Sequence, residues 1–172
     1  MIALKPISIF DEQMPACIAL RVLPEQEDFV ASNAMSLAEA YDVNKARALT
    51  GDGDIAVPYA VYENGKMVGF AMYGYFPRGG NDDEESYTDN EPCYYVWRLF
   101  VDKNHQGRGI GREVLRQLME EIKTKPHGEA EYCFASYVAE NIASKTTFKS
   151  YGYEEDGRVI GGEIVARYRL PQ

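Results

Sequence analysis

The sequence predicts an α/β fold in which a mixed sheet is covered by helices. Three observations support this prediction: an Asn-Gly pair between two apolar runs, a stretch at 93–101 that is apolar on both faces, and apolar residues at helical spacing after Gly109. The chain has 172 residues, of which 45% are hydrophobic and 26% charged. That composition is typical of a globular protein with a sizeable core, and we expect one domain over residues 1–172.

The N-terminal part is expected to hold a short strand followed by two helical regions. The ranges are 2–9 for the strand, 11–22 for the first helix, and Pro24 toward Ala48 for the second region. Asp11 is a candidate N-cap, with Pro15 tolerated only near the first turn. Ser36 followed by Glu39 resembles a capping box for the continuation to Ala48.

The middle of the chain is expected to supply three strands. Asn64-Gly65 separates the apolar runs at 55–62 and 67–76, and such a pair is the strongest short signal for a β-hairpin. A polar, acidic loop follows at 77–91. The strand at 93–101 is apolar on both faces and is therefore expected at the centre of the sheet.

The C-terminal part is expected to alternate helices and strands. Apolar residues at helical spacing predict a helix from Gly109 to Lys123, namely Ile110, Val114, Leu115, Leu118, Met119 and Ile122. A buried strand at 131–138 precedes a helix at 142–151 that Gly152 would end. Residues 153–160 and 163–170 read as a final hairpin around Gly161-Gly162.

Charge and cysteine content exclude several classes of protein. The net charge of −9 argues against a nucleic-acid binder, which needs clustered basic residues, although it suits a cationic substrate or plain solubility. No apolar run is long enough to cross a membrane, and no export signal precedes the first strand. Cys17, Cys93 and Cys133 are far apart, and only two histidines accompany them. We expect a cytoplasmic, reduced protein with no metal and no membrane partner.

The segment Gln106-Gly-Arg-Gly-Ile-Gly-Arg112 is the part of the sequence that points to chemistry. It follows a buried strand and opens an amphipathic helix. Glycines let the backbone approach a ligand closely, and unpaired amide N–H groups at a helix start favour an anion. Arg108 and Arg112 add positive charge, so a pyrophosphate is the expected guest; the alternative is a glycine-rich turn without a ligand.

The same segment carries a resemblance to a known family. It fits neither GxxxxGK[ST] nor GxGxxG, but Gln106-Gly-Arg-Gly-Ile-Gly111 matches the acyl-CoA motif [QR]xxGx[GA] of the GNAT N-acetyltransferase superfamily. The order of elements is also similar over nearly the whole chain. Three stretches resemble the spermine/spermidine (diamine) N-acetyltransferase branch: 24–40, 68–74 and 162–167. The resemblance implies the GNAT fold, with a mostly antiparallel central sheet, and acetyl-CoA as co-substrate.

The resemblance also implies positions for the acetyl-CoA contacts. The backbone of Leu99, Phe100 and Val101 would pair with the pantetheine arm, and an amide of Phe100 or Val101 would face the thioester oxygen. Asn141 would bond the same arm. The amides of the motif would hold the pyrophosphate, namely those of Gln106, Gly107, Arg108, Gly109, Ile110, Gly111 and Arg112.

Two departures from the family pattern leave the acid and base unassigned. Phe148 stands where the family usually places a tyrosine that protonates the leaving thiolate, and Trp97 stands where many members carry a carboxylate. Tyr151, Tyr137 and Tyr73 are candidates to replace the missing acid, although a tyrosine in these elements is more often a packing residue. Positioning alone can sustain a slower enzyme without the missing pair.

The acceptor is expected to be a primary amine, in particular a polyamine such as spermidine or spermine. Candidate carboxylates for its ammonium groups are Glu25, Glu27, Asp28 and Glu163, together with the acidic run 82–85. The alternative for these acidic residues is a solvated surface or complementation of a helix dipole. Alternatives for the function are acetylation of a protein or antibiotic amine, or a non-catalytic acyl-CoA sensor. A homodimer is one assembly that the sequence leaves open.

Overall fold

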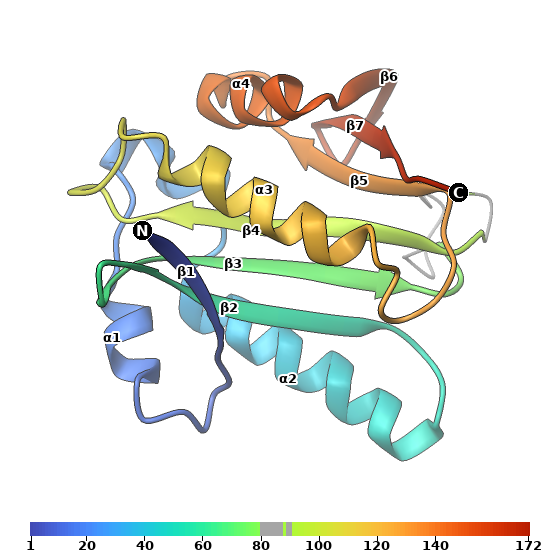
Figure 1. Ribbon diagram of the computed structural model, residues 1–172, viewed down its shortest axis with the longest axis horizontal. Coiled ribbons are helices and arrows are strands. Elements are labelled where there is room, and N and C mark those ends of the chain that lie inside the picture. The colour runs from blue at the N-terminus through green and yellow to red at the C-terminus, as the bar shows by residue number, and fades with distance from the viewer. Residues whose placement is uncertain (80–87, 89–90) are drawn as a thin grey trace.

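A computed structural model describes residues 1–79, 88 and 91–172 of the chain. It confirms the predicted α/β class, with helices on both sides of one mixed sheet (Figure 1). The elements in chain order are β1 (Ile2–Pro6), α1 (Met14–Ala19), η1 (Pro24–Phe29), α2 (Asn33–Thr50), β2 (Ile55–Glu63), β3 (Lys66–Phe76), β4 (Cys93–Val101), α3 (Ile110–Ile122), β5 (Tyr132–Tyr137), α4 (Ile142–Tyr151), β6 (Glu154–Ile160) and β7 (Glu163–Arg169). None of the helices within these described residues is long and apolar enough to cross a membrane.

The sheet has seven strands in the order β1-β2-β3-β4-β5-β7-β6. Every neighbouring pair is antiparallel except β4 and β5, which run parallel. Asn64 and Gly65 form the two-residue turn between β2 and β3, with φ of 50° and 85°. Positive φ at both positions is what a type I′ turn requires, and the predicted hairpin is therefore confirmed.

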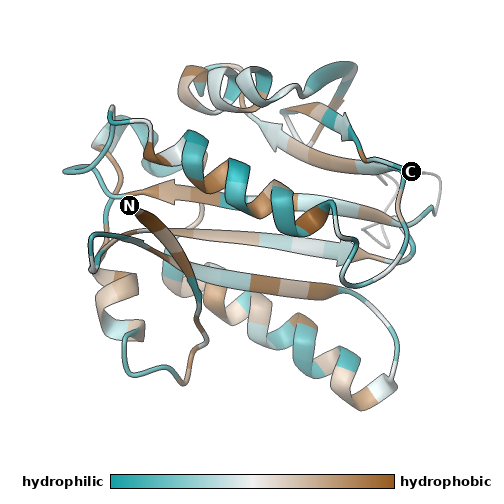
Figure 2. Cartoon of the chain, in the orientation of Figure 1, coloured by the Kyte–Doolittle hydropathy of each residue, from teal (hydrophilic) through white to brown (hydrophobic). Residues whose placement is uncertain are grey.

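The two faces of the sheet are covered by different helices. Helix α3 buries the apolar face that the sequence predicted, including Val114, Leu118 and Ile122, against one side of the sheet. On the other side, Leu37 and Ala40 of α2 pack against a second cluster that contains Phe70. Figure 2 shows hydrophobic and hydrophilic bands alternating along α3, as expected for a helix with one buried face.

The N-terminal helices begin at residues other than those predicted. Helix α1 starts after Gln13, and Asp11 accepts a hydrogen bond from the Gln13 backbone N–H at 2.7 Å without capping the helix. The first six residues of the second region, from Pro24, form the 3₁₀ helix η1, and the predicted box at Ser36 is wrong. The cap of α2 is Ser32, whose Oγ accepts from the Met35 N–H at 3.2 Å. A Ser or Thr at several nearby positions gives the same sequence signal, and packing chooses among them.

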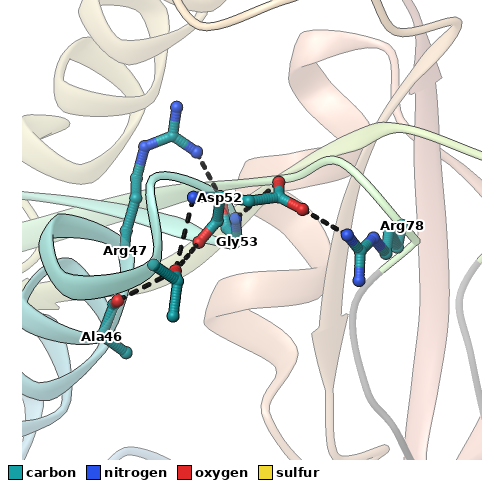
Figure 3. Close-up of polar contacts among 6 residues, drawn as sticks. Ala46, Arg47, Asp52, Gly53 and Arg78 are labelled. Carbon is teal, nitrogen blue, oxygen red and sulfur yellow. Dashed lines mark hydrogen bonds and ion pairs between the residues drawn. The ribbon is translucent and has the colours of Figure 1, made fainter.

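The turn after α2 is held by side chains rather than by regular backbone pairing (Figure 3). Arg47 donates from its guanidinium to the Gly53 carbonyl at 2.6 Å, and Asp52 accepts from the Gly53 N–H at 2.7 Å. Asp52 also pairs with Arg78, just after β3. Since both side chains of that ion pair are exposed, it contributes little stability, but it orients the turn that leads into β2.

Candidate functional site

The sheet opens between β4 and β5. These strands are paired only at Tyr94 with Cys133 and at Tyr95 with Phe134, near their N-terminal ends. Beyond Tyr95 the two strands diverge, which Figure 1 shows as a gap between β4 and the β5–α4 segment. Trp97 lies in this region as the extra residue of a β-bulge, because Val96 pairs with Tyr73 and Arg98 with Met72. The edge of β4 from Trp97 to Val101 is therefore not paired with β5.

A cavity of about 860 Å³ occupies this opening. Its walls come from η1, the second half of β4, the turn before α3, the beginning of α4, and single residues of β5 and β7. That volume is within the range of small-molecule and cofactor sites. Leu99 and Val101 line the cavity, whereas Phe100 faces the opposite core and is 4% exposed. Alternation along a strand accounts for this difference.

The turn before α3 presents unpaired backbone donors to the cavity. The first helical hydrogen bond of α3 runs from the Glu113 N–H to the Gly109 carbonyl at 3.2 Å. Within the described residues, the amide N–H groups from Gly107 to Arg112 have no acceptor. Gly107 and Gly109 have φ of 73° and 77°, a conformation that side chains disfavour. This arrangement can hold an anion at the helix start.

Two side chains, Asp102 and Gln106, fix the position of this turn through partly buried hydrogen bonds. Asp102, 8% exposed, accepts from the Arg21 N–H at 3.1 Å and from the Asn104 N–H at 3.0 Å. Burial alone would raise the pKa of this carboxyl, but the hydrogen bonds outweigh burial and the net pKa is lowered. Gln106 donates from Nε2 to the Val101 carbonyl at 2.9 Å and to Gln26 Oε1 at 2.8 Å. The turn is thereby tied to both β4 and η1.

The two arginines of the motif have different surroundings. Arg112 and the glycines at 107, 109 and 111 line the cavity together with Gln106 and Ile110. Arg108 does not line it, because its guanidinium pairs with Glu63 of the β2–β3 hairpin at 2.9 Å. His105 lies beside this ion pair, with its Nδ1 3.3 Å from the Arg108 guanidinium and 3.7 Å from a carboxylate oxygen of Glu63. Of the two charges expected at the turn, only that of Arg112 faces the cavity.

Of the carboxylates predicted to bind the acceptor, some line the cavity and others do not. Glu27 and Asp28 line the cavity from η1, and Glu163 lines it from the first position of β7. Glu25 is exposed on η1 but does not line the cavity. The acidic run 82–85 lies outside the described residues.

The residues at the family's acid and base positions also line the cavity, but they carry no titratable group. Phe148 is 3% exposed, and its ring is stacked on Tyr137 with centroids 6.1 Å apart. Trp97 packs edge-on against Phe76 at 5.8 Å. Asn141 lines the cavity as the N-cap of α4, where its Oδ1 accepts from the Ser144 N–H at 3.1 Å.

None of the three tyrosines considered as substitute acids (Tyr137, Tyr151 and Tyr73) lines the cavity. Burial and Glu155 raise the pKa of Tyr137 to about 12, and its hydroxyl donates to Glu155 at 3.2 Å. The Tyr151 ring lies under Lys123 at 5.3 Å and packs on Tyr168. The Tyr73 hydroxyl donates to Glu121 at 2.7 Å on the α3 side of the sheet. None of these three tyrosines is therefore placed in the cavity wall to protonate the leaving thiolate.

Three polar residues that line the cavity were not predicted from the sequence: Arg98, Tyr95 and Ser136. Ser36 and Glu39 of α2 hold Arg98, whose Nε donates to Ser36 Oγ at 3.1 Å and whose NH2 donates to Glu39 at 3.0 Å. The positive charge of Arg98 in the cavity wall is thus balanced by Glu39. Tyr95 and Ser136 also line the cavity and bond to each other at 2.6 Å. These contacts depend on strand register, which composition and periodicity do not reveal.

Comparison with known proteins identifies relatives across most of the chain. Residues 25–153 match the model of the acetyltransferase (GNAT) family. A "Spermine/spermidine N(1)-acetyltransferase" of Bacillus subtilis (strain 168) is 26% identical over 164 residues, covering 92% of this chain and 93% of that protein. Among solved structures, an aminoglycoside acetyltransferase in complex with coenzyme A superimposes with a TM-score of 0.69 at 17% identity, covering 98% of this chain and 95% of the other. A domain from Methanocaldococcus jannaschii superimposes with a TM-score of 0.62 at 16% identity, covering 99% of both chains.

Proposed function

Since the chain belongs to the GNAT acetyltransferase family and is an acetyl-CoA-dependent N-acetyltransferase, we propose that its acceptor is a polyamine such as spermidine or spermine. The observation that carries the proposal is the set of carboxylates in the cavity wall. Glu27 and Asp28 come from η1 and Glu163 from β7. Carboxylates on separate elements suit a chain with several ammonium groups better than a monoamine.

Acetyl-CoA would occupy the opening between β4 and β5. The free amides from Gly107 to Arg112 would hold its pyrophosphate, with Arg112 adding charge. The pantetheine arm would run along Leu99 and Val101, with Asn141 as a polar partner, and the β4 backbone would donate to the thioester oxygen. Arg108 is left out of this contact set because it is paired with Glu63.

The reaction would be a direct transfer without a covalent enzyme intermediate. Within the described part of the chain, Cys17, Cys93 and Cys133 are all buried, and burial is the main reason that each thiol pKa is raised to about 12. None of them lines the cavity. The amine would therefore attack the thioester carbonyl itself, positioned by the walls of the cavity.

An amine panel tests the proposal. Release of free CoA thiol from acetyl-CoA should depend on added amine, and kcat/KM for spermidine should exceed that for butylamine by at least tenfold. Kanamycin and a lysine-containing peptide represent the antibiotic and protein acceptors. A preference for either of these over polyamines would replace the proposed acceptor. Acetyl-CoA binding with no thiol release for any amine would instead make the protein an acyl-CoA sensor.

A further inference from the structure

Three side chains from three different strands form a hydrogen-bonded row in the cavity wall. The Tyr95 hydroxyl on β4 lies 2.6 Å from Ser136 Oγ on β5, and Ser136 Oγ in turn contacts a carboxylate oxygen of Glu163 on β7. All three residues line the cavity. Tyr95 is 8% exposed, while Ser136 and Glu163 are half-buried.

The direction of the hydrogen bonds in this row follows from the number of protons. An ionised carboxylate only accepts, so the single hydroxyl proton of Ser136 is donated to Glu163. Tyr95 must then donate its own proton to Ser136 Oγ. The row therefore ends on Glu163 as the final acceptor, and the carboxylate is oriented by a serine that is itself oriented by a buried tyrosine.

The row lies where the sheet opens. Tyr95 belongs to the last registered pair between β4 and β5, and Ser136 is two residues beyond the partner of that pair, Phe134. The other carboxylates of the wall, Glu27 and Asp28, are exposed on η1, and no side-chain hydrogen bond or ion pair within the described part of the chain holds them in one orientation. Among the described wall residues, Glu163 is thus the carboxylate that has both partial burial and a fixed donor.

We infer that Glu163 is the proton acceptor of the transfer reaction, with Ser136 and Tyr95 as positioning residues. The inference rests on the proposed function. The amine nitrogen forms a bond to the thioester carbonyl carbon, and one N–H proton passes to the Glu163 carboxylate. The C–S bond then breaks with its electron pair on sulfur, and the thiolate takes a proton from water. Glu163 later returns its proton to water, so protons and charge balance over one turnover.

This role replaces the carboxylate that the family pattern expects at the position of Trp97. Trp97 and Phe148 bring no titratable group to the cavity, and the Tyr137 hydroxyl is bound to Glu155. A positioned general base contributes about 10²–10⁴-fold to a rate. Glu163 on β7, oriented by Ser136 on β5, would provide that contribution from a different strand.

The test compares four variants with the wild-type enzyme, using whichever amine of the panel gives the highest kcat/KM. Glu163→Gln keeps size and hydrogen bonding but removes basicity, and Glu163→Ala leaves space for a small carboxylate. Ser136→Ala removes the orienting donor. Glu155→Gln is the matched control, because Glu155 is a carboxylate on the neighbouring strand β6 that does not line the cavity. Calorimetry with acetyl-CoA reports on folding and on the CoA site in each variant.

Glu163→Gln should lower kcat by about 100-fold or more, with a smaller rise in KM for the amine, because one ammonium-binding charge is lost, and with acetyl-CoA affinity unchanged. Added formate should restore at least tenfold to Glu163→Ala and nothing to Glu163→Gln. Ser136→Ala should lose about tenfold in kcat, and Glu155→Gln should match wild type. A rise in KM with unchanged kcat, or no rescue by formate, would overturn the inference. A wild-type protein inactive toward every amine would refute the proposed function instead.

Discussion

The glycine at the start of α3 offers the sharpest test of the CoA site. Gly109 has φ of 77°, and an added Cβ would meet no atom within 4 Å. A side chain at this position therefore carries a backbone cost, whereas its Cβ meets no clash. The left-handed conformation costs an L residue about 1–2 kcal/mol. That is small against the roughly 5–15 kcal/mol of a folded protein, so Gly109→Val should remain folded, with Tm lowered by about 2–8 °C.

The effect on ligand binding should be larger than the effect on folding. Gly109 lines the cavity beside the free amides of the helix start, so the valine side chain would stand where the pyrophosphate approaches. Losing one hydrogen bond to a charged group costs about 1.5–3 kcal/mol. We therefore expect the Kd for CoA to rise about 10- to 150-fold, measured by calorimetry at constant salt.

Gly111→Ala provides the matched control. Gly111 also lines the cavity, but it lies within α3, and an added Cβ would be 4.0 Å from Val101 Cγ2. Alanine at a helical position stabilises by up to about 1 kcal/mol relative to glycine. This variant should melt at or above the wild-type temperature, with a Kd for CoA within about threefold. A folded Gly109→Val protein with an unchanged Kd would refute the assignment of the turn as the pyrophosphate site.

Three further predictions concern the acceptor, the leaving group and acid stability. Replacing Glu27 and Asp28 by Gln and Asn should raise KM for spermidine at least threefold at low salt and less at high salt, because exposed charges are screened. Glu25→Gln, on the same element but outside the cavity, should leave KM unchanged. Equal effects of the two changes on KM would contradict a polyamine site. Phe148→Tyr should raise kcat tenfold or more if thiolate departure limits turnover, and should lower stability by about 1–3 kcal/mol because the added hydroxyl is buried without a partner. An unchanged kcat would show either that thiolate departure does not limit turnover or that the new hydroxyl does not reach the sulfur. Burial lowers the pKa of His127 below its usual 6.5, despite an opposing effect of Glu121, so the unfolded chain binds more protons and stability should fall as pH drops below about 6.5. His127→Asn should flatten this part of a plot of Tm against pH. An equally steep plot for the variant would exclude this histidine as the cause.

Local signals explain which parts of the fold could be predicted. The apolar stripe of α3, the Asn64-Gly65 turn and the stop of α4 at Gly152 are each encoded within a few neighbouring residues, and the structure confirms all three. The start of α2 was wrong because Ser32 and Ser36 are four residues apart and carry the same capping chemistry. Only tertiary packing distinguishes them: Ser36 is buried and bonds Arg98.

Contacts between distant residues explain what sequence reasoning missed in the site. Arg108 was expected at the pyrophosphate, but Glu63, 45 positions earlier, neutralises it. Tyr95, Ser136 and Glu163 are far apart in the chain, and only the strand order β4-β5-β7 brings them into one row. Such a row has no local signature, because a shift of one residue in any strand would turn its side chain to the other face.

The single amide of Gln106 bridges two walls of the cavity that would hold different ligands. Its two N–H groups reach the end of β4 and, through Gln26, the helix that carries Glu27 and Asp28. If CoA binding orders the turn, this contact would carry the effect to the proposed acceptor wall, and thermodynamic linkage would then require the amine to change CoA affinity by the same factor. Couplings of this kind are typically about 1–3 kcal/mol. A bridge of this kind predicts cooperative binding in either order, in which the acyl donor and the amine each raise the affinity of the other.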